Sequence, residues 1–465
     1  MTTSKRIYTA SSPIVRLQKE LGLWQAVCEP SDEVYALCND AEDSRMSRTA
    51  LVDCLNDYIG LELQHCIAIS KPHAILCSSR SAYKLEDIDS DVLEGSIVLL
   101  LPMVESGTTG DDVWHFCEED NGNVDIALLP SPQPQSWNDV TLMVFSSGTS
   151  GLPKAVELSH RALISVFSLA ISACYFNLSK RETAFICMPI HHVGGICTWL
   201  MNTIRGDCCA FMSAQRPARF ESWADAIIRW RCNKLAATPT SVRAFVKQGL
   251  CEKIGAAGCV NVVNVGAGSL SPWLFEVARR AFKCPILHNW GMSELAGGVV
   301  RASAYWPNTS GSVGRLCGDV QARIVDETDN DVDGRGHLLI KSSSMMNGYF
   351  DDERATREAI DEDGWLRTGD LAYFNENQEL FIVDRIKDLI KYKGWSIAPA
   401  ELEAILETHD QVVEAAVIGT DANDANGEMV STIPGRLVGQ NELILSFSPR
   451  LSSYCLREVW VTRIW

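Results

Sequence analysis

Short apolar runs alternate with helix-forming stretches through the middle of the chain, and this alternation limits the possible folds more than any other feature. Two of the runs, 184–188 and 261–265, end near glycine or proline, as buried parallel strands do. Stretches 220–231 and 271–282 have helical character. We therefore predict an α/β fold of mainly parallel sheets sandwiched by helices. In such folds, ligands bind at the carboxyl ends of the strands.

The pattern changes in the second half of the chain. Residues 321–326 and 337–341 alternate apolar and polar side chains, which favours antiparallel strands in a subdomain of their own. The chain has 465 residues, of which 46% are hydrophobic, and that suffices for a large core and for two or three domains.

A loop rich in glycine and hydroxyl residues directly follows one apolar run. The residues of this loop that could bind an anion are Ser146, Ser147, Gly148, Thr149, Ser150, Gly151 and Lys154. Glycines let backbone N–H groups come close to an anion, hydroxyls add donors, and the lysine adds a mobile positive charge. The loop is not a Walker loop, because Ala155 rather than serine or threonine follows Lys154. A polyphosphate site is therefore predicted here, with a plain turn as the alternative.

Three further blocks follow this loop in order. Residues 288–294 read HNWGMSE, residues 364–371 read GWLRTGDL, and residues 383–394 read VDRIKDLIKYKG. A shorter segment around Gly348 and Tyr349 agrees with them. With the loop, these blocks resemble the signature of the acyl-adenylate-forming (AMP-binding) superfamily. That group includes acyl- and aryl-coenzyme A ligases, adenylation domains of peptide synthetases and beetle luciferases. The resemblance spans roughly residues 140–427.

The resemblance implies a two-step activation of a small carboxylic acid. A carboxylate oxygen attacks the α-phosphate of ATP, giving an acyl-adenylate and pyrophosphate, and a thiol then displaces AMP. Coenzyme A is the expected thiol, and Mg²⁺ the expected metal. Such chemistry depends chiefly on positioning and on charge neutralisation.

The same resemblance assigns roles to individual residues. The loop would hold the phosphates, Glu294 would bind Mg²⁺, and Ser293 would donate to the α-phosphate. Trp290 would stack on adenine, although a core tryptophan is the alternative. Asp370 would accept hydrogen bonds from the ribose, and Arg385 would donate to ribose or phosphate. The remaining nucleotide-binding positions are Gly266, Ala267, Gly268, Asn289, Gly291 and Met292.

The expected acid site lies near His192. In the family a histidine at this distance after Pro189 lies beside the substrate carboxylate, whereas on its own it would be read as a core residue. Gly194 and Gly195 would open space for a ring or chain. Peptide-synthetase domains have an aspartate here that pairs with an amine, and residues 190–195 contain none. An aryl or medium-chain acid without an α-amino group is therefore expected.

The resemblance also divides the chain into domains. A large ATP- and acyl-binding domain would span residues 1–384, and a hinge with Lys387 at its pivot would span residues 385–390. A small α+β domain would span residues 391–465, with Lys391, Lys393 and Gly394 in the loop that meets the thiol acceptor. Domain rotation of this kind separates two half-reactions.

The end of the chain departs from the family pattern. Family members carry a C-terminal lysine that bridges carboxylate and α-phosphate, and no lysine follows Lys393 here. The small domain is thus expected to be incomplete and the adenylation step to be impaired. Three alternatives to a coenzyme A ligase stay open: an enzyme that loads a carrier-protein thiol, a nucleotide- or acyl-binding pseudoenzyme, and an adenylate-using oxygenase such as luciferase.

Composition narrows the partners and the compartment. The formal net charge of −18 argues against nucleic acids and anionic membranes as main partners. The 17 cysteines form no Cys-x-x-Cys pair, which favours reduced thiols over a disulfide framework or a zinc site. We find neither a signal peptide nor a transmembrane stretch, so a cytoplasmic location is expected.

Overall fold

The computed structural model describes most of the segment from residue 136 to residue 437 and shorter pieces before it. The described residues are 8–9, 49–51, 60–70, 74–78, 88, 91, 97–101, 136–146, 153–172, 182–211, 220–303, 307–392, 395–406, 408, 412–421 and 428–437. The predictions for Ser147, Gly148, Thr149, Ser150, Gly151, Lys393, Gly394 and the tail after residue 437 lie outside the described residues.

The middle part of the chain forms a five-stranded parallel sheet, which confirms the predicted α/β class. Its strands, in spatial order, are β11 (Ile286–His288), β10 (Val262–Val265), β9 (Lys234–Ala237), β7 (Thr183–Ile186) and β8 (Cys208–Phe211). All four neighbouring pairs are parallel. The two predicted apolar runs are therefore strands of this sheet.

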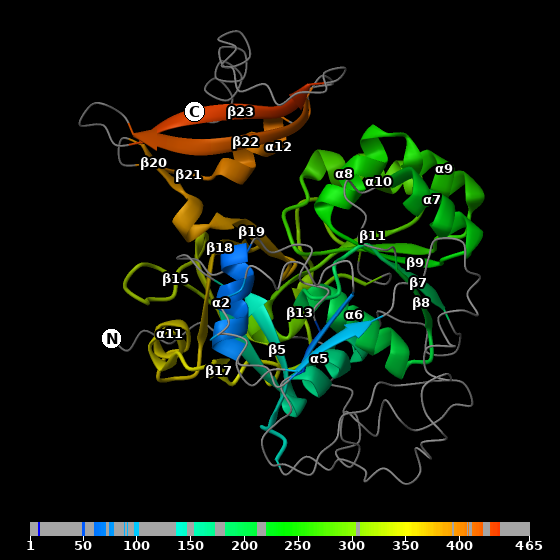
Figure 1. The fold of residues 1–465 in the computed structure, drawn as a ribbon. Helices are drawn as coiled ribbons and strands as arrows, with labels where there is room; N and C mark the ends of the chain where they lie inside the picture. Colours follow the sequence, from blue (N-terminus) through cyan, green and yellow to red (C-terminus); the bar gives the residue numbers. More distant parts are fainter. Residues whose placement is uncertain are drawn as a thin grey trace, which may run out of the picture.

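Four helices cover one face of the sheet (Figure 1). They are α7 (Phe220–Arg229), α8 (Pro239–Lys247), α9 (Leu250–Ala257) and α10 (Pro272–Phe282). Thr238 and Ser271 cap the N-termini of α8 and α10 with their side-chain oxygens, each just before a proline that fits the first helical turn. Phe185, Leu235 and Val263 point into the core that these helices close. Because side chains alternate along a strand, their neighbours face the opposite side of the sheet.

The opposite side carries a second core around two more helices. The helices are α5 (His160–Ser172), which begins directly after Ser159, and α6 (Val193–Ile204). A small sheet packs with them, formed by β12 (Trp290–Met292), β13 (Gly297–Arg301) and β14 (Arg315–Leu316). Apolar side chains of α5, α6 and β13 belong to one buried cluster.

The phosphate-loop region forms a hairpin rather than the end of a parallel strand. Strand β5 (Val140–Ser146) runs antiparallel to β6 (Lys154–Ser159), and β17 (Gly348–Tyr349) pairs with β6 on its other edge. The apolar run before the loop is therefore an antiparallel strand that ends at Ser146, and it does not belong to the parallel sheet. The apolar run alone does not distinguish the two cases, because both kinds of buried strand look alike in sequence.

A separate antiparallel sheet lies where the alternating pattern predicted one. Its strands in order are β1 (Tyr8–Thr9), β15 (Gln321–Val325), β16 (Gly336–Lys341), β18 (Leu366–Phe374) and β19 (Leu380–Arg385). All its pairs are antiparallel. Helix α11 (Glu353–Ala359) lies beside it.

The part of the chain after β19 has its own small core. The one-turn helix η5 (Ile386–Asp388) leads into a hairpin of β20 (Ile390–Tyr392) and β21 (Trp395–Ile397), then α12 (Pro399–Leu406) and a hairpin of β22 (Val412–Asp421) and β23 (Glu428–Leu437). Ile390, Leu406 and Val417 are buried together. Asp384 accepts a hydrogen bond from the Ala400 N–H at 2.9 Å, which ties this part to β19.

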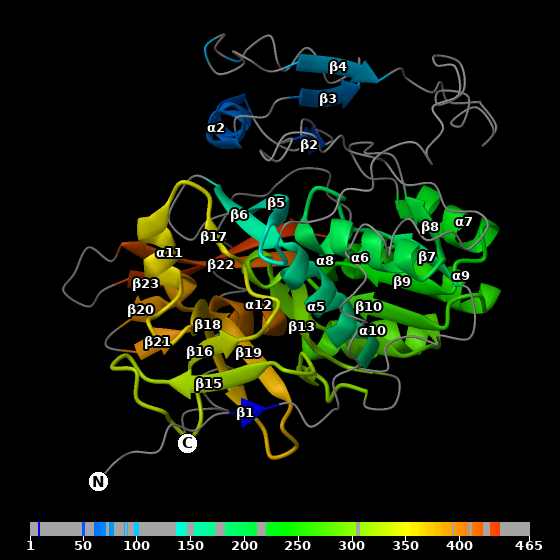
Figure 2. The same ribbon diagram turned by 90° about the horizontal axis from the view of Figure 1, so that it is seen from below.

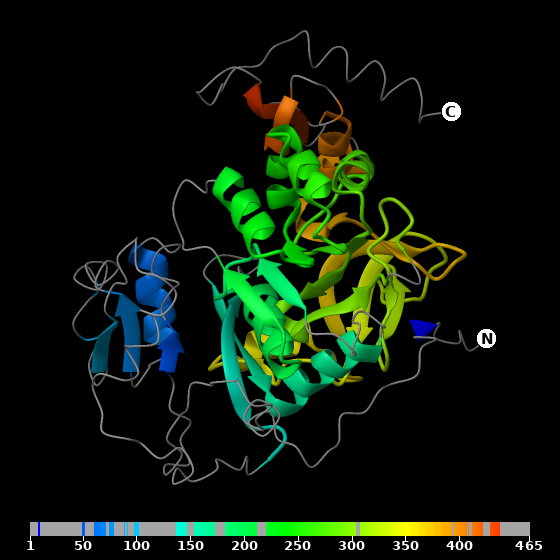
Figure 3. The same ribbon diagram turned by 90° about the vertical axis from the view of Figure 1, so that its right-hand side faces the viewer.

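An N-terminal parallel sheet lies to the side of β5 and β6 (Figure 3). It consists of β2 (Thr49–Leu51), β3 (Ala74–Ser78) and β4 (Ile97–Leu101), with helix α2 (Gly60–Ser70) packed near them (Figure 2). His65 of α2 donates a ring N–H to the Pro153 carbonyl at 3.0 Å, one residue before Lys154. Across the described residues, every helix is too short or too polar to span a bilayer.

Candidate active site

The predicted nucleotide-binding residues Gly266, Ala267 and Trp290 lie just beyond the carboxyl ends of β10 and β11, where the fold class predicts ligands to bind. This part of the site is called the nucleotide end below. Gly266 and Ala267 follow β10 directly, and Ala267 has a left-handed φ of 64°. Buried His288 donates from Nε2 to the Gly268 carbonyl at 3.1 Å. Burial lowers the pKa of His288, so the ring is neutral and serves as a fixed support for this turn.

Trp290, Asp370 and Arg385 come together although they belong to three separate sequence blocks. The Trp290 indole N–H donates to Asp370 Oδ2 at 3.0 Å. Asp370 on β18 and Arg385 on β19 are direct partners in the antiparallel register. Arg385 Nε lies 3.2 Å from Asp370 Oδ1, in an ion pair without hydrogen-bond geometry. The structure therefore unites the predicted ribose-binding pair with the predicted adenine-stacking residue.

The buried environment of Asp370 disfavours the charged form of its carboxyl group. The residue is 3% exposed, and burial raises its pKa from 3.8 to about 6, against the opposing effects of Arg385 and Trp290. Two partners thus hold the carboxylate in place without fully replacing the water it has lost. Further hydrogen bonds from ligand hydroxyls would stabilise its charged form.

Glu294, Tyr349 and Lys154 form a second cluster near the first. Glu294 lies in the one-turn helix η4 (Ser293–Leu295) and is 6% exposed. The Tyr349 hydroxyl donates to Glu294 Oε1 at 2.8 Å, and Lys154 Nζ lies 4.9 Å from the centre of the Tyr349 ring. The predicted metal-binding carboxylate and the predicted phosphate-binding lysine therefore contact the same tyrosine.

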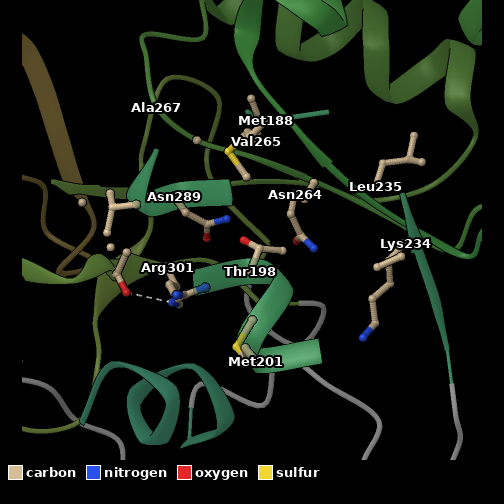
Figure 4. A pocket seen from close by; sticks show the side chains of 18 of the residues that line it. Met188, Thr198, Met201, Lys234, Leu235, Asn264, Val265, Ala267, Asn289 and Arg301 are labelled. Atoms are coloured by element: carbon tan, nitrogen blue, oxygen red, sulfur yellow. Dashed lines mark hydrogen bonds between the residues drawn. The ribbon is translucent and has the colours of Figure 1, made fainter. Parts of the chain in front are cut away.

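A cavity of about 130 Å³ runs from the nucleotide end along the side of the parallel sheet that faces α6. The sheet residues Ala184, Ala236 and Asn264 line it, as do Gly194, Thr198 and Met201 of α6. Figure 4 shows Thr198 and Met201 on the α6 side of the cavity and Asn264 on the sheet side. Gly266, Ala267, Trp290 and Gly291 line its nucleotide end. The small side chains of Ala184, Ala236 and Gly194 leave this space open.

The other end of the cavity is polar. Lys234 lines it and forms ion pairs with Glu182 and, at 3.1 Å, with Asp207. Arg205 Nη2 lies 3.6 Å from an oxygen of each acid, so the four formal charges balance. The side-chain oxygens of Asn202 and Asn264 have no hydrogen-bond partner among the described residues. The polar part of the cavity therefore has no net formal charge, and these two amide oxygens can accept hydrogen bonds from a ligand.

His192 stands beside this cavity but does not line it. It is the residue before α6, its ring centre lies 4.3 Å from that of His191, and burial lowers its pKa. Val193 and Gly194 line the cavity next to it. The role of His192 beside a carboxylate stays a prediction.

The two glycines after Val193 have different functions. A Cβ at Gly194 would lie 3.0 Å from the flexible Met188 Sδ, whereas a Cβ at Gly195 would overlap the Pro189 carbonyl oxygen. Gly195 does not line the cavity. The expectation that both glycines open space is therefore wrong for Gly195, which instead lets α6 approach the turn at 189–190.

The remaining predicted site residues make structural contacts, which are described here one by one. Asn289 lines the cavity, accepts from the Ala302 N–H at 3.2 Å and donates to the Leu287 carbonyl at 3.2 Å. Ser293 begins η4 and Met292 packs against the core beside it. Lys387 is exposed in η5, and Lys391 donates to Ser396 Oγ at 2.7 Å in the hairpin that follows.

Sequence reasoning missed four residues that shape the site: His65, Lys234, Asn264 and Tyr349. Tyr349 belonged to a segment that matched the family, but nothing in its local sequence ties it to Glu294, which is 55 positions away. Asn264 interrupts an apolar run, and Lys234 directly precedes one, which are the only signals that their local sequences give.

Comparisons with known proteins show the family of the chain. The AMP-binding enzyme family matches residues 49–350. A luciferin 4-monooxygenase from Photuris pensylvanica is 31% identical over 384 residues, covering 80% of this chain and 68% of that protein. A 4-coumarate-CoA ligase from Narcissus pseudonarcissus is 34% identical over 376 residues, covering 78% of this chain and 64% of that protein.

Solved structures share the fold at lower identity. ATP-bound MatB from Rhodopseudomonas palustris superposes with a TM-score of 0.69 at 22% identity, covering 83% of this chain and 73% of that one. o-Succinylbenzoate CoA synthetase from Bacillus subtilis, bound to an acyl-adenylate, gives 0.67 at 21% identity, covering 86% and 74%. The chain belongs to the AMP-binding enzyme family, whose members include acyl-CoA ligases and luciferases.

Proposed function

We propose that this chain joins a small carboxylic acid to AMP with release of pyrophosphate, and then transfers the acyl group to the thiol of coenzyme A. In the first step the carboxylate oxygen bonds to the α-phosphorus of ATP while the bond to pyrophosphate breaks. In the second step the thiol sulfur bonds to the carbonyl carbon, its proton is lost and AMP leaves.

One observation carries the proposal. Four distant segments contribute to two clusters beside one cavity: Trp290 contacts Asp370, which pairs with Arg385, and Tyr349 contacts both Glu294 and Lys154. Trp290 also lines the cavity at the carboxyl ends of the parallel strands. A nucleotide bound to these clusters would place its α-phosphate at this end of the cavity, where an acid's carboxylate would lie. Holding two reactants in this way is the main source of rate in such reactions.

Each cluster has a distinct task in this scheme. Asp370 would accept hydrogen bonds from the ribose hydroxyls, and Arg385 and Lys154 would neutralise phosphate charge. Trp290 would stack on the adenine while its indole N–H keeps Asp370 oriented. His192, neutral because of burial, would lie beside the carboxylate, and Lys387 would act as the hinge between the steps.

The residues present fit a magnesium ion bound together with phosphates. Mg²⁺ binds through one or two carboxylates plus phosphate oxygens and keeps several waters. Glu294 offers one such carboxylate, and its hydrogen bond to Tyr349 occupies only Oε1. When bound there, the metal would offset the charge that develops on the phosphates.

The cavity supports a compact acid. Gly266 lines the nucleotide end of the cavity, and Lys234 lines its polar end. Lys234 pairs with Val262, which precedes Gly266 by four residues. At the rise of a β-strand, these four residues give the cavity a length of about 13 Å. Its volume of about 130 Å³ is close to the roughly 150 Å³ of an apolar cavity that holds benzene. An acid with one aromatic ring or a short chain suits these dimensions, and a long acyl chain does not.

Pyrophosphate exchange across a panel of acids tests the proposal. Labelled pyrophosphate should enter ATP in the presence of benzoate- or cinnamate-type acids, and should not do so with ordinary amino acids. Exchange with amino acids alone would contradict the proposed acid class.

The product of the acyl-transfer step distinguishes the coenzyme A ligase from the alternative functions. Thioester formation with coenzyme A supports the ligase, whereas acylation of only a carrier protein supports the carrier-loading alternative. ATP binding without exchange with any acid would identify a pseudoenzyme.

A further inference from the structure

We infer that Tyr349 is a positioning residue that keeps Glu294 and Lys154 apart and thereby presents each of them to magnesium-bound ATP. This inference rests on the proposed function, because it assigns Glu294 to the metal and Lys154 to the phosphates. It adds a residue that contacts both groups and acts through them.

Strong backbone restraints fix Tyr349 in its position. It pairs with Val156 in the antiparallel register between β17 and β6, the strand that begins at Lys154. The Phe350 N–H donates to the Ala155 carbonyl at 2.8 Å, and the Met346 N–H donates to the Glu294 carbonyl at 2.9 Å. The Tyr349 segment is therefore bound on one side to the phosphate-loop strand and on the other to the Glu294 turn.

The Tyr349 side chain offers a different surface to each charged group. Its hydroxyl donates to Glu294 Oε1 at 2.8 Å, and its ring face lies under the Lys154 ammonium group at 4.9 Å. Burial and the Glu294 charge both raise the pKa of Tyr349, so the phenol keeps the proton that it donates.

This arrangement prevents two opposite charges from neutralising each other before the nucleotide arrives. Among the described residues, no ion pair joins Lys154 to Glu294. A cation held over a ring keeps its full charge, and a carboxylate that accepts one phenol hydrogen bond keeps its second oxygen for a metal. Without the hydroxyl, Glu294 would be free to turn toward Lys154, and a direct ion pair would have to break before Mg²⁺ and phosphate could bind.

Calorimetric titration of ATP with and without Mg²⁺ tests the inference. In Tyr349→Phe the ring under Lys154 remains and only the hydroxyl is lost. We expect the affinity for ATP with Mg²⁺ to fall about tenfold, as the loss of one hydrogen bond to a charged group predicts, and the affinity in EDTA to fall as well, because the new ion pair would occupy Lys154. In Tyr349→Leu both contacts are lost, so the affinity should fall at least as far under both conditions.

Two further variants sharpen the test. Tyr373→Phe removes a hydroxyl from a tyrosine that stacks on Phe381 elsewhere in the same domain, and it should change neither affinity. In a Glu294→Gln background, Tyr349→Phe should have little additional effect, because the group that it positions is already absent.

The outcomes separate this inference from the proposed function. If Tyr349→Phe binds ATP as the wild type does under both conditions, or loses the same affinity in the Glu294→Gln background, Tyr349 is not a positioning residue for Glu294. If the wild-type protein binds no ATP under either condition, the proposed function itself fails.

Discussion

Trp290 and Asp370 are 80 positions apart in the chain, yet the indole N–H of one donates to a carboxylate oxygen of the other at 3.0 Å. The hydrogen bond connects the small sheet that contains β12 to the antiparallel sheet that contains β18. It brings a flat aromatic face and a buried carboxylate into one site. Four predictions follow from this arrangement and from the cavity beside it.

Replacing Asp370 with alanine should weaken ATP binding by about 1–3 kcal/mol, because charge-assisted hydrogen bonds to the ribose are lost. Calorimetry measures the change directly. Asp329→Ala provides a control, since Asp329 forms an exposed ion pair with Arg367 and should leave the affinity unchanged. Unaltered affinity in Asp370→Ala, with the fold intact by circular dichroism, would refute the ribose assignment.

The nucleotide-free protein should become more stable when Asp370 is replaced with asparagine. The folded-state pKa of about 6 lies above the ordinary 3.8, so the charged carboxylate destabilises the fold at neutral pH, and this penalty disappears as pH falls from about 6 toward 4. The difference of about 2 pKa units corresponds to at most about 3 kcal/mol. Thermal melts at pH 7.5 should show the gain, and melts near pH 4 should show little. A variant less stable than the wild type at pH 7.5 would contradict the prediction.

Alanine at Gly194 and at Gly195 should have different effects. Gly195→Ala places a methyl group on the Pro189 carbonyl oxygen, so we expect a loss of several kcal/mol in unfolding free energy or a failure to fold. Gly194→Ala meets only the movable Met188 thioether, so it should fold and shift acid preference toward smaller acids. Chemical denaturation and pyrophosphate exchange measure the two effects. Equal stability of both variants would show that the close approach is not needed.

Asn264 should favour acids with a hydroxyl at the end remote from the carboxylate. Its side-chain oxygen has no hydrogen-bond partner among the described residues, and it faces the cavity (Figure 4). Asn264→Leu should reduce the preference for 4-hydroxycinnamate over cinnamate, measured as a ratio of kcat/KM, by about three- to tenfold. The exposed Asn261, just before the same strand, is the matched control and should tolerate leucine without a change in this ratio. A ratio unaffected by Asn264→Leu would exclude this role.

Sequence patterns predicted the local elements well because those elements depend on local chemistry. Apolar runs closed by glycine or proline became β7 and β10, and alternating residues became β15 and β16. The pattern did not predict that β5 pairs in the antiparallel direction, because an apolar run indicates that a strand is buried but not how its neighbour runs. It was also insufficient at Gly195, because a glycine that opens space and one that permits close packing look the same in sequence.

The sequence by itself determined the family of this protein, the α/β class and the order of the nucleotide-binding blocks, since short-range spacing and residue type encode all three. Only the tertiary structure decided which of these residues meet. Side chains separated by dozens of positions, such as Tyr349 with Glu294 or Lys234 with Asp207, are brought together by strand pairing and helix packing. Such contacts depend on the summed burial of many apolar residues, so no local pattern contains them.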